Sequence, residues 1–360
     1  MKNILSSKFL LLGSLVAILI LLTGCGRGAD ARFSSLADVD GAGIGVISTL
    51  PMDSVMLRFG SSDVKRYDKF INLFVDFEGG HRDVALLDEV SAARVLSRNP
   101  EYTLLDTLSI AGNTVYAVVP KIKLRSDEAD DASLGGWIER QKSRLYRNFF
   151  DENARKLIWG GLCTTVVIFI FGVMLAVVLA SLLTYLYISK RCMWLYRPLS
   201  SFIFIIHDVP SVVLMMFFYY VLFAASMNGV VVSIIALGVY TSGTLTKIFK
   251  IHIGQVGREQ YEAGLMLGLS SRQIYRYIIL PQAVKSMLPL AVGEFKVLLR
   301  ATSYAGYIAQ KDLVKAVDAI REDTLDSFIP LLVVGLLYLL LSWLIVHISG
   351  YLYSKLFVHD

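Results

Sequence analysis

Two cations lie inside an otherwise apolar stretch near the carboxyl end of the chain. Lys296 and Arg300 are one helical turn apart and share a helix face, whereas Glu294 points largely away from both. Ionisable residues inside a membrane span are functional candidates by default. A cationic stripe of this kind could bind a substrate carboxylate, extend to the membrane surface, or pair with an acidic residue of another chain. Together with Thr302 and Ser303 they form the candidate substrate pathway.

The sequence offers no constellation for catalysis or ATP binding. It contains no GxxxxGK[ST] phosphate loop, no HExxH metal motif and no GxSxG nucleophile motif. Its five histidines are scattered, and His207 beside Asp208 is interpreted as lying at the cytoplasmic surface, with a proton relay inside the bilayer as the alternative. We therefore expect a protein that is not an enzyme and that holds no metal or cofactor of its own.

The composition indicates a membrane protein. The chain has 360 residues, of which 55% are hydrophobic and 18% are charged, whereas a soluble domain is nearer half apolar and a quarter charged. Its net charge of +5 is scattered, without a basic run dense enough to predict nucleic acid as a partner. Membrane lipid is the partner that this composition predicts.

Five segments approach the length of about 20 apolar residues that a helix needs to cross a bilayer. The second is short and must borrow apolar residues that precede Pro210. The sequence thus predicts a mainly α, polytopic membrane domain over residues 157–360, preceded by a small α/β extracytoplasmic lobe. The predicted spans are Leu157–Ser189, Val212–Ala225, Gly229–Phe249, Met287–Ile308 and Ser327–Leu352.

Residues 26–124 have the character of a small α/β lobe. Strand-like runs occur at Gly43–Thr49 and Asn113–Lys121, and Arg82–Ser97 is typical of a strand that leads into a helix. Residues 125–156 are interpreted as a polar linker followed by an amphipathic helix at the membrane surface.

Residues 1–25 have the plan of an export signal: a basic start, an apolar core and small residues before Cys25. The end, LLTGC, resembles the lipobox of bacterial lipoproteins, which implies cleavage before Cys25 and lipidation on it. The alternative is an uncleaved membrane anchor. Either way the lobe is expected outside the cytoplasm, with the protein in the bacterial inner membrane.

A polar island separates the third and fourth predicted spans, within a cytoplasmic loop over residues 250–285. Gly268 suits the left-handed position that closes a helix, and Ser270 with Gln273 forms a capping box for the next helix. Pro281 is expected to end or kink that second helix. On the first helix, Glu262 offers a carboxylate to a basic partner or a helix start, and the small residues Ala263 and Gly264 allow another surface to approach closely.

The island resembles the "EAA" coupling loop of ABC importer permeases, in the spacing Glu-Ala-Gly, three residues, Gly, nine residues, Ile, one residue, Leu-Pro. Further stretches resemble the polar amino-acid uptake group of that family: HDVPSVVLMMFFYY, SGTLTKIFK and GEFKVLLRATSY. The chain departs from the pattern at Gly264, where Ala is usual, at Lys247, where Glu is usual, and at Ala301, where Asp is usual.

This resemblance implies a permease that moves solute by alternating access. It further implies a partner ABC ATPase that binds ATP and Mg²⁺, a second permease chain, and amino acids as the solute class, without saying which one. The alternative is a permease-like lipoprotein that acts as a sensor or scaffold without transport.

The lobe resembles part of a type II solute-binding protein. The resemblance places the contacts to a ligand carboxylate on Ser48 and Thr49, and the contact to its amino group on Asp88. Such proteins bind between two lobes, and only one fits before Trp137. We therefore interpret the lobe as a remnant or docking module, with a separate solute-binding protein as a further partner.

Overall fold

The computed structural model describes residues 33–120, except 34, 40, 49, 60, 61, 100 and 111, and residues 142–357, except 143, 190–192, 325 and 327. The chain divides into two compact units. One comprises the described residues up to Ala154 together with Ile320–Pro330, and the other comprises Arg155–Ala319 and Leu331–Asp360. Cys25 and the predicted linker before residue 142 lie outside the described residues.

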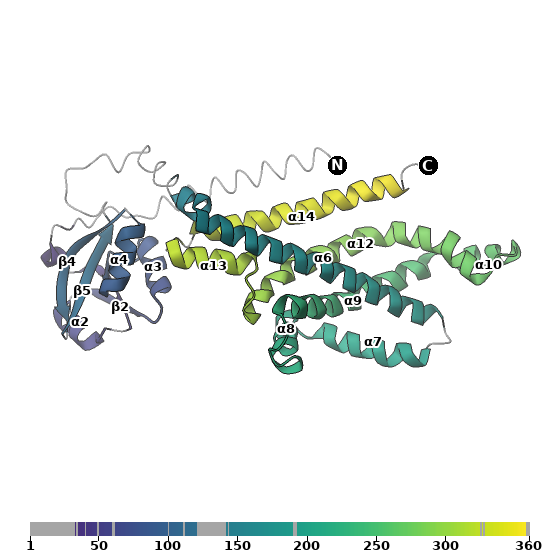
Figure 1. Ribbon diagram of the computed structural model, residues 1–360, viewed down its shortest axis with the longest axis horizontal. Coiled ribbons are helices and arrows are strands. Elements are labelled where there is room, and N and C mark those ends of the chain that lie inside the picture. The colour runs from purple at the N-terminus through teal and green to yellow at the C-terminus, as the bar shows by residue number, and fades with distance from the viewer. Residues whose placement is uncertain are drawn as a thin grey trace. The chain divides into compact units, whose positions relative to one another are not determined.

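The first unit is built on a mixed five-stranded sheet in the order β2-β1-β3-β5-β4 (Figure 1). The three parallel strands β1, β2 and β3 are joined by helical crossovers, and β5 pairs antiparallel with both β3 and β4. Gly112, at φ +82°, lies in the tight turn between β4 and β5, a backbone position that favours glycine. The strands are β1 Gly43–Ile47, β2 Asp63–Tyr67, β3 Val84–Leu87, β4 Tyr102–Ile110 and β5 Asn113–Pro120.

Both faces of this sheet are covered. Helices α3 (Phe70–Glu78) and α4 (Glu89–Arg98) pack their apolar faces on one side, where Phe74 and Phe77 contact Tyr102. Helix α2 (Met52–Arg58) covers the other side. The predicted α/β lobe is confirmed, including the strands at residues 43 and 113 and the strand-to-helix transition at residue 88.

A buried charge cluster links α3 to two segments far along the chain within this unit. The Arg144 guanidinium pairs with Glu78 and binds Asp326 at 2.9 and 3.0 Å, and Asn148 donates to Asp326 at 2.8 Å. Burial alone would lower the pKa of Arg144, but the charges of Glu78 and Asp326 outweigh it, so this pKa is raised. Arg144 therefore keeps its charge, and it neutralises carboxylates that would be costly to bury alone.

The second unit is helical. Among the described residues, four helical stretches are long and apolar enough to cross a membrane, and a bent helix pair makes a fifth if it counts as one span. Helix α9 (Gly229–Gln255) packs against both α7 (Met193–Asp208) and α12 (Leu280–Ala301) (Figure 1). The stretches are α6 Glu152–Ile188, α9 Gly229–Gln255, Ser271–Ile308, which contains α12 Leu280–Ala301, and Ile329–Lys355 of α14 Phe328–Phe357.

The second predicted span takes an unexpected form. Residues before Pro210 form a separate helix, α7 (Met193–Asp208), instead of extending the next one straight. Helix α8 (Ser211–Phe217) and the π-helical turn Phe218–Leu222 follow after a bend of 113°. Pro210 accounts for the break, since it supplies no N–H and disfavours helical backbone in the residue before it.

The chain re-enters a helix at α13 (Leu313–Thr324), which is capped by a fully buried carboxylate. Asp312 accepts the backbone N–H groups of Val314 and Lys315 at 3.3 and 3.1 Å. Burial raises the pKa of Asp312 to about 6. The helix cap therefore titrates close to neutral pH.

We expect the Arg144 cluster to stabilise the first unit far more than a neighbouring exposed ion pair does. Arg144→Gln leaves two carboxylates in a buried site and should cost about 3–5 kcal/mol of unfolding free energy. Arg98→Gln removes an exposed pair with Asp323 at 3.1 Å, in which both side chains are about half exposed, and should cost about 0–1 kcal/mol. Unfolding of the lobe in denaturant, monitored by its resistance to protease, measures the loss of unfolding free energy in each variant. Equal losses in the two variants would contradict the stabilising role of the Arg144 cluster.

We also expect Asp312 to make stability depend on pH. The pKa of Asp312 in the folded protein is about 6, above the ordinary value of 3.8. Its contribution to folding stability is therefore present below about pH 4 and is lost as pH rises through 6. Asp312→Asn keeps an N-cap side chain without the titration. Thermal unfolding of the purified protein at pH 4.5 and 7.5 should therefore depend less on pH in this variant, by about 1–3 kcal/mol. Asp318→Asn, next to the exposed Lys315, is the control and should keep the wild-type pH dependence.

Candidate functional site

The island between the third and fourth spans is a compact helical hairpin. Helix α10 (Arg258–Met266) is followed by a short turn and then by α11 (Ser271–Ile274). Glu262 lies on the outer face of α10, where its carboxylate accepts from Arg258 at 2.9 Å one turn earlier. Both side chains are more than half exposed, so this pair stabilises little and leaves Glu262 accessible to a partner.

The predicted helix-ending glycine and the predicted capping box of the turn are confirmed. Gly268 adopts φ +75°, which only glycine reaches without strain, and the next N–H, from Leu269, donates to the Gly264 carbonyl at 3.1 Å. The Gln273 side chain accepts the Ser270 backbone N–H at 2.9 Å and the Ser270 hydroxyl at 2.7 Å, as part of a capping box. These local contacts give the turn a defined shape.

Gly264 is needed by the chain itself. A Cβ atom at this position would lie 2.8 Å from Cγ1 of Ile274, which is fully buried. The surface that approaches Gly264 is thus the chain's own second helix, while Ala263 stays exposed. The close approach predicted for Gly264 is therefore made by Ile274, whereas a surface that approaches Ala263 stays a prediction.

Pro281 does not end the second helix. The π-helical turn Tyr275–Ile279 widens the backbone just before it, and Leu280 donates to the Tyr275 carbonyl across five residues. Pro281 is the second residue of α12, directly after this wider turn, so the helix continues through a residue that supplies no N–H. The second helix of the hairpin and the fourth span are consequently one continuous helical stretch, Ser271–Ile308.

Of the four candidate pathway residues, three are at least partly exposed and one is buried. Arg300 is exposed and Lys296 is half-buried, so both are available to another molecule. Ser303 is also partly exposed, although its hydroxyl donates to the Arg300 carbonyl at 2.8 Å. Thr302 is fully buried and donates to Leu299 at 2.6 Å, so the structure does not place it on a pathway.

The break between α7 and α8 lies beside the middle of α9. His207 is 3.1 Å from the Thr244 hydroxyl, and its ring makes an edge contact with Tyr240 at 4.9 Å between centroids. Lys250, near the end of α9, instead binds Tyr196 at the start of α7 at 2.8 Å. His207 therefore lies beside the middle of α9, and its placement at the cytoplasmic surface stays a prediction.

The candidate ligand residues of the lobe lie at one edge of the sheet. Ser48 follows β1, and Asp88 follows the adjacent parallel strand β3 and precedes α4. The carboxyl ends of parallel strands are a common place for ligand contacts. Asp88 is exposed, whereas Thr49 lies outside the described residues. Within the described residues, no group of three or more His, Cys, Asp or Glu side chains could hold a metal ion.

Residues 168–358, more than half of the chain, match the family described as binding-protein-dependent transport system inner membrane component. The chain belongs to this family. Two curated relatives are each 32% identical: the probable glutamine ABC transporter permease protein GlnM of Bacillus subtilis over 116 residues, and the histidine/lysine/arginine/ornithine transport system permease protein HisM of Salmonella typhimurium over 119 residues. These matches cover 32% and 33% of this chain, and about half of each relative (54% and 51%).

One solved structure resembles the helical part of this transport-system component. It is a crystal structure of an amino acid ABC transporter with histidines, with a TM-score of 0.50 and 24% identity. The similarity covers 56% of this chain and 94% of the solved chain, and it shows a shared fold.

The hairpin of this family member has an apolar tip that was not predicted from the sequence. Leu265, Met266 and Leu267 are 49%, 89% and 77% exposed around the end of α10. Exposed apolar side chains gathered on one surface indicate an interaction site. The run GLMLGL could have predicted this apolar tip, because it places four large apolar residues at a turn that is otherwise polar.

We expect Gly264→Ala to loosen the hairpin. Overpacking against Ile274 should cost about 1–3 kcal/mol, which exceeds the gain of about 1 kcal/mol that alanine offers inside a helix. Hydrogen exchange of the Leu269 N–H, which binds Gly264, measures the opening. Gly254→Ala is the matched control, since nothing lies within 4 Å of the added Cβ.

A double-mutant cycle with Ile274→Ala tests the cause. If overpacking is responsible, the loss caused by Gly264→Ala should shrink when Ile274 is truncated. An unchanged loss in the Ile274→Ala background would place the defect elsewhere.

Proposed function

We propose that the chain is the permease subunit of an ATP-driven ABC importer for amino acids. The observation that carries this proposal is the folded hairpin with the spacing of the coupling-loop motif, in a chain of the transport-system family. The permease moves solute by alternating access, and a separate ABC ATPase binds ATP and Mg²⁺ and hydrolyses the nucleotide. A second permease chain completes the pathway.

The hairpin is the attachment point for the ATPase. Glu262 is accessible and carries the charge that recognises a basic groove, while Met266 and Leu267 supply apolar area at the tip. Ala263, Gly264, Gly268, Ser270, Gln273 and Pro281 hold the shape of the hairpin and join it to the fourth span. These residues transmit force and perform no chemistry.

Amino acids are the solute class that the relatives support, since GlnM is named for glutamine and HisM for histidine, lysine, arginine and ornithine. A cationic site made by Lys296 and Arg300, with Ser303 beside them, suits the carboxylate that every amino acid carries. Because Thr302 is buried, we assign it a packing role.

The lobe lies outside the cytoplasm of a bacterial inner membrane, anchored at its start by a signal that ends at a lipidated Cys25. Ser48, Thr49 and Asp88 mark an edge where ligand contacts would lie, but a single lobe cannot close around a ligand. Its role is therefore that of a docking module for a separate solute-binding protein.

The second candidate function is a sensor or scaffold that does not transport solute. Two observations favour it: the single lobe, and an exposed Lys247 where the resemblance implies a glutamate. In that case the chain would not carry an active ATPase.

The test is the ATPase that co-purifies with this chain from membranes. We expect wild type to carry ATPase activity, and Glu262→Arg to lose both the subunit and its activity by about tenfold or more, which is about 1.4 kcal/mol of binding. Glu322→Arg, the same change on the predicted outer side, is the control and should retain both. Uptake of labelled amino acids by cells with the complex then identifies the solute. If no ATPase co-purifies with correctly folded wild type, the proposed importer function is wrong and the sensor or scaffold function replaces it.

A further inference from the structure

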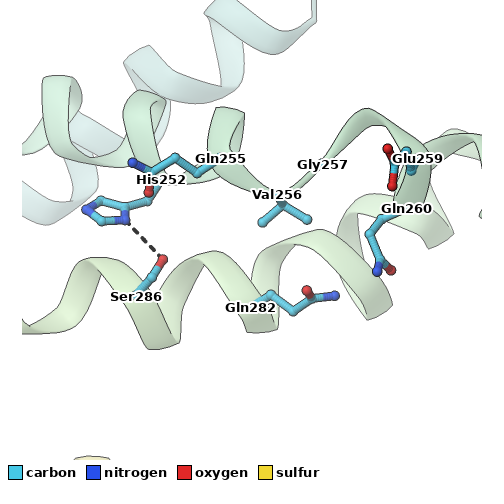
Figure 2. Close-up of a pocket in the computed structure, with 8 residues that line it drawn as sticks. All are labelled: His252, Gln255, Val256, Gly257, Glu259, Gln260, Gln282 and Ser286. Atoms are coloured by element: carbon cyan, nitrogen blue, oxygen red, sulfur yellow. Dashed lines mark hydrogen bonds between the residues drawn. The ribbon is translucent and has the colours of Figure 1, made fainter.

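A polar cleft opens between the ends of two spans, directly beside the hairpin. It has a volume of about 400 Å³ and lies where α9 ends, α10 begins and α12 passes underneath (Figure 2). Val256 and Gly257 line it at the break between α9 and α10. The side chains that give it chemical character are His252, Gln255, Glu259, Gln260, Gln282 and Ser286.

These side chains favour a cation. Among the described residues that line the cleft, Glu259 carries the one formal negative charge and there is no lysine or arginine. Three glutamines add amide oxygens that accept hydrogen bonds. Gln282 uses its NH₂ group to donate to the Ile278 carbonyl at 3.0 Å, which leaves its amide oxygen for another donor.

The base of the cleft is held by one contact between the two spans. His252 Nδ1 lies 3.0 Å from the Ser286 hydroxyl, so α9 and α12 are linked at this level (Figure 2). Gln282 lies one turn before Ser286 on α12, and Glu259 lies on the first turn of α10. A group that enters the cleft would therefore touch both spans and the hairpin at once.

The cleft shares helix α10 with the surface that is proposed to receive the ATPase. Glu259 lies three residues before Glu262 on α10, so the two carboxylates lie on neighbouring parts of the same helix face. A partner seated on the hairpin tip has further surface close to this opening.

We propose that the cleft receives a basic side chain, best an arginine, from a surface loop of the partner ATPase. A guanidinium offers five donors, which match the Glu259 carboxylate and the glutamine oxygens. The ATPase then holds the permease at two points, the hairpin tip and this cleft, and pulls directly on α9 and α12. This inference rests on the proposed function, because it requires that an ATPase binds the hairpin.

Site-specific photo-crosslinking in the assembled complex tests the proposal. A benzophenone amino acid is placed at Leu267 on the tip, at Gln282 in the cleft, or at Lys285, which is exposed on α12 three residues beyond Gln282 and does not line the cleft. We expect crosslinks to the ATPase from positions 267 and 282 and at least tenfold less from 285, both without nucleotide and with ATP and vanadate. Mass spectrometry of the product from position 282 should identify a loop that contains a basic residue.

The outcomes separate this inference from the proposed function. Crosslinks from position 267 without any from position 282 would overturn the proposed second contact at the cleft but would not contradict the proposed importer function. Crosslinks from neither position, in a folded complex, remove the hairpin as the ATPase site and with it both proposals. A product at 282 that maps to a loop without a basic residue overturns the assigned chemistry.

Charge reversal adds an independent measurement. Glu259→Lys should weaken ATPase association about tenfold, or about 1.4 kcal/mol, whereas Lys285→Glu, the opposite reversal outside the cleft, should leave it within about twofold. Titration of purified ATPase onto permease in lipid nanodiscs measures both affinities. If Lys285→Glu strengthened association by as much as Glu259→Lys weakens it, a general surface potential would account for both effects and a specific cleft contact would be overturned.

Discussion

The helical unit is governed by the need to satisfy every backbone hydrogen bond without help from water. In hydrocarbon an unpaired N–H or C=O costs several kcal/mol, so spans remain helical and their buried hydroxyls turn back on their own carbonyls. Thr184, Ser233 and Thr246 each donate to the carbonyl four residues earlier, at 2.7–2.8 Å. The sharp bend between α7 and α8 lies against α9, where His207 contacts the Thr244 hydroxyl. Irregular backbone at that depth is tolerated only where protein or a water-filled cavity surrounds it.

The same rule explains how the polar hairpin is attached. A loop would have separated the hairpin from the fourth span, but the π-helical turn and the placement of Pro281 keep the helix continuous from Ser271 to Ile308. Gly264 and Ile274 then fix α10 against the start of that helix. Helix α10 is thus packed against a helix whose backbone continues into the fourth span.

In the lobe, charges rather than backbone continuity join distant segments. Glu78 at the end of α3, Arg144 before the first span and Asp326 before the last are separated by up to 248 positions in the chain, yet they share one buried cluster. A buried pair gives little net stability relative to an apolar core, but removing one partner is costly. Such a cluster specifies which segments meet, and it holds the lobe to the residues that precede α14.

The sequence by itself determined the elements whose signals are local. Long apolar runs identified the spans, and strand-like runs identified β1, β3 and β5. Gly268, Ser270 and Gln273 defined the turn because their hydrogen bonds connect residues only a few positions apart. The short polar strand β2 and the strand β4 escaped notice, since a strand's stability depends on partners elsewhere in the sheet.

Only the tertiary structure decided which residues face one another. It placed His207 half-way along α9, turned Gly264 toward Ile274, buried Thr302, and opened the cleft beside α10. A sequence fixes the spacing along one helix, but the rotation and depth of two packed helices depend on how their side chains interlock. That is why the turn of the hairpin could be predicted from local spacing, whereas its internal packing and the cleft next to it could not.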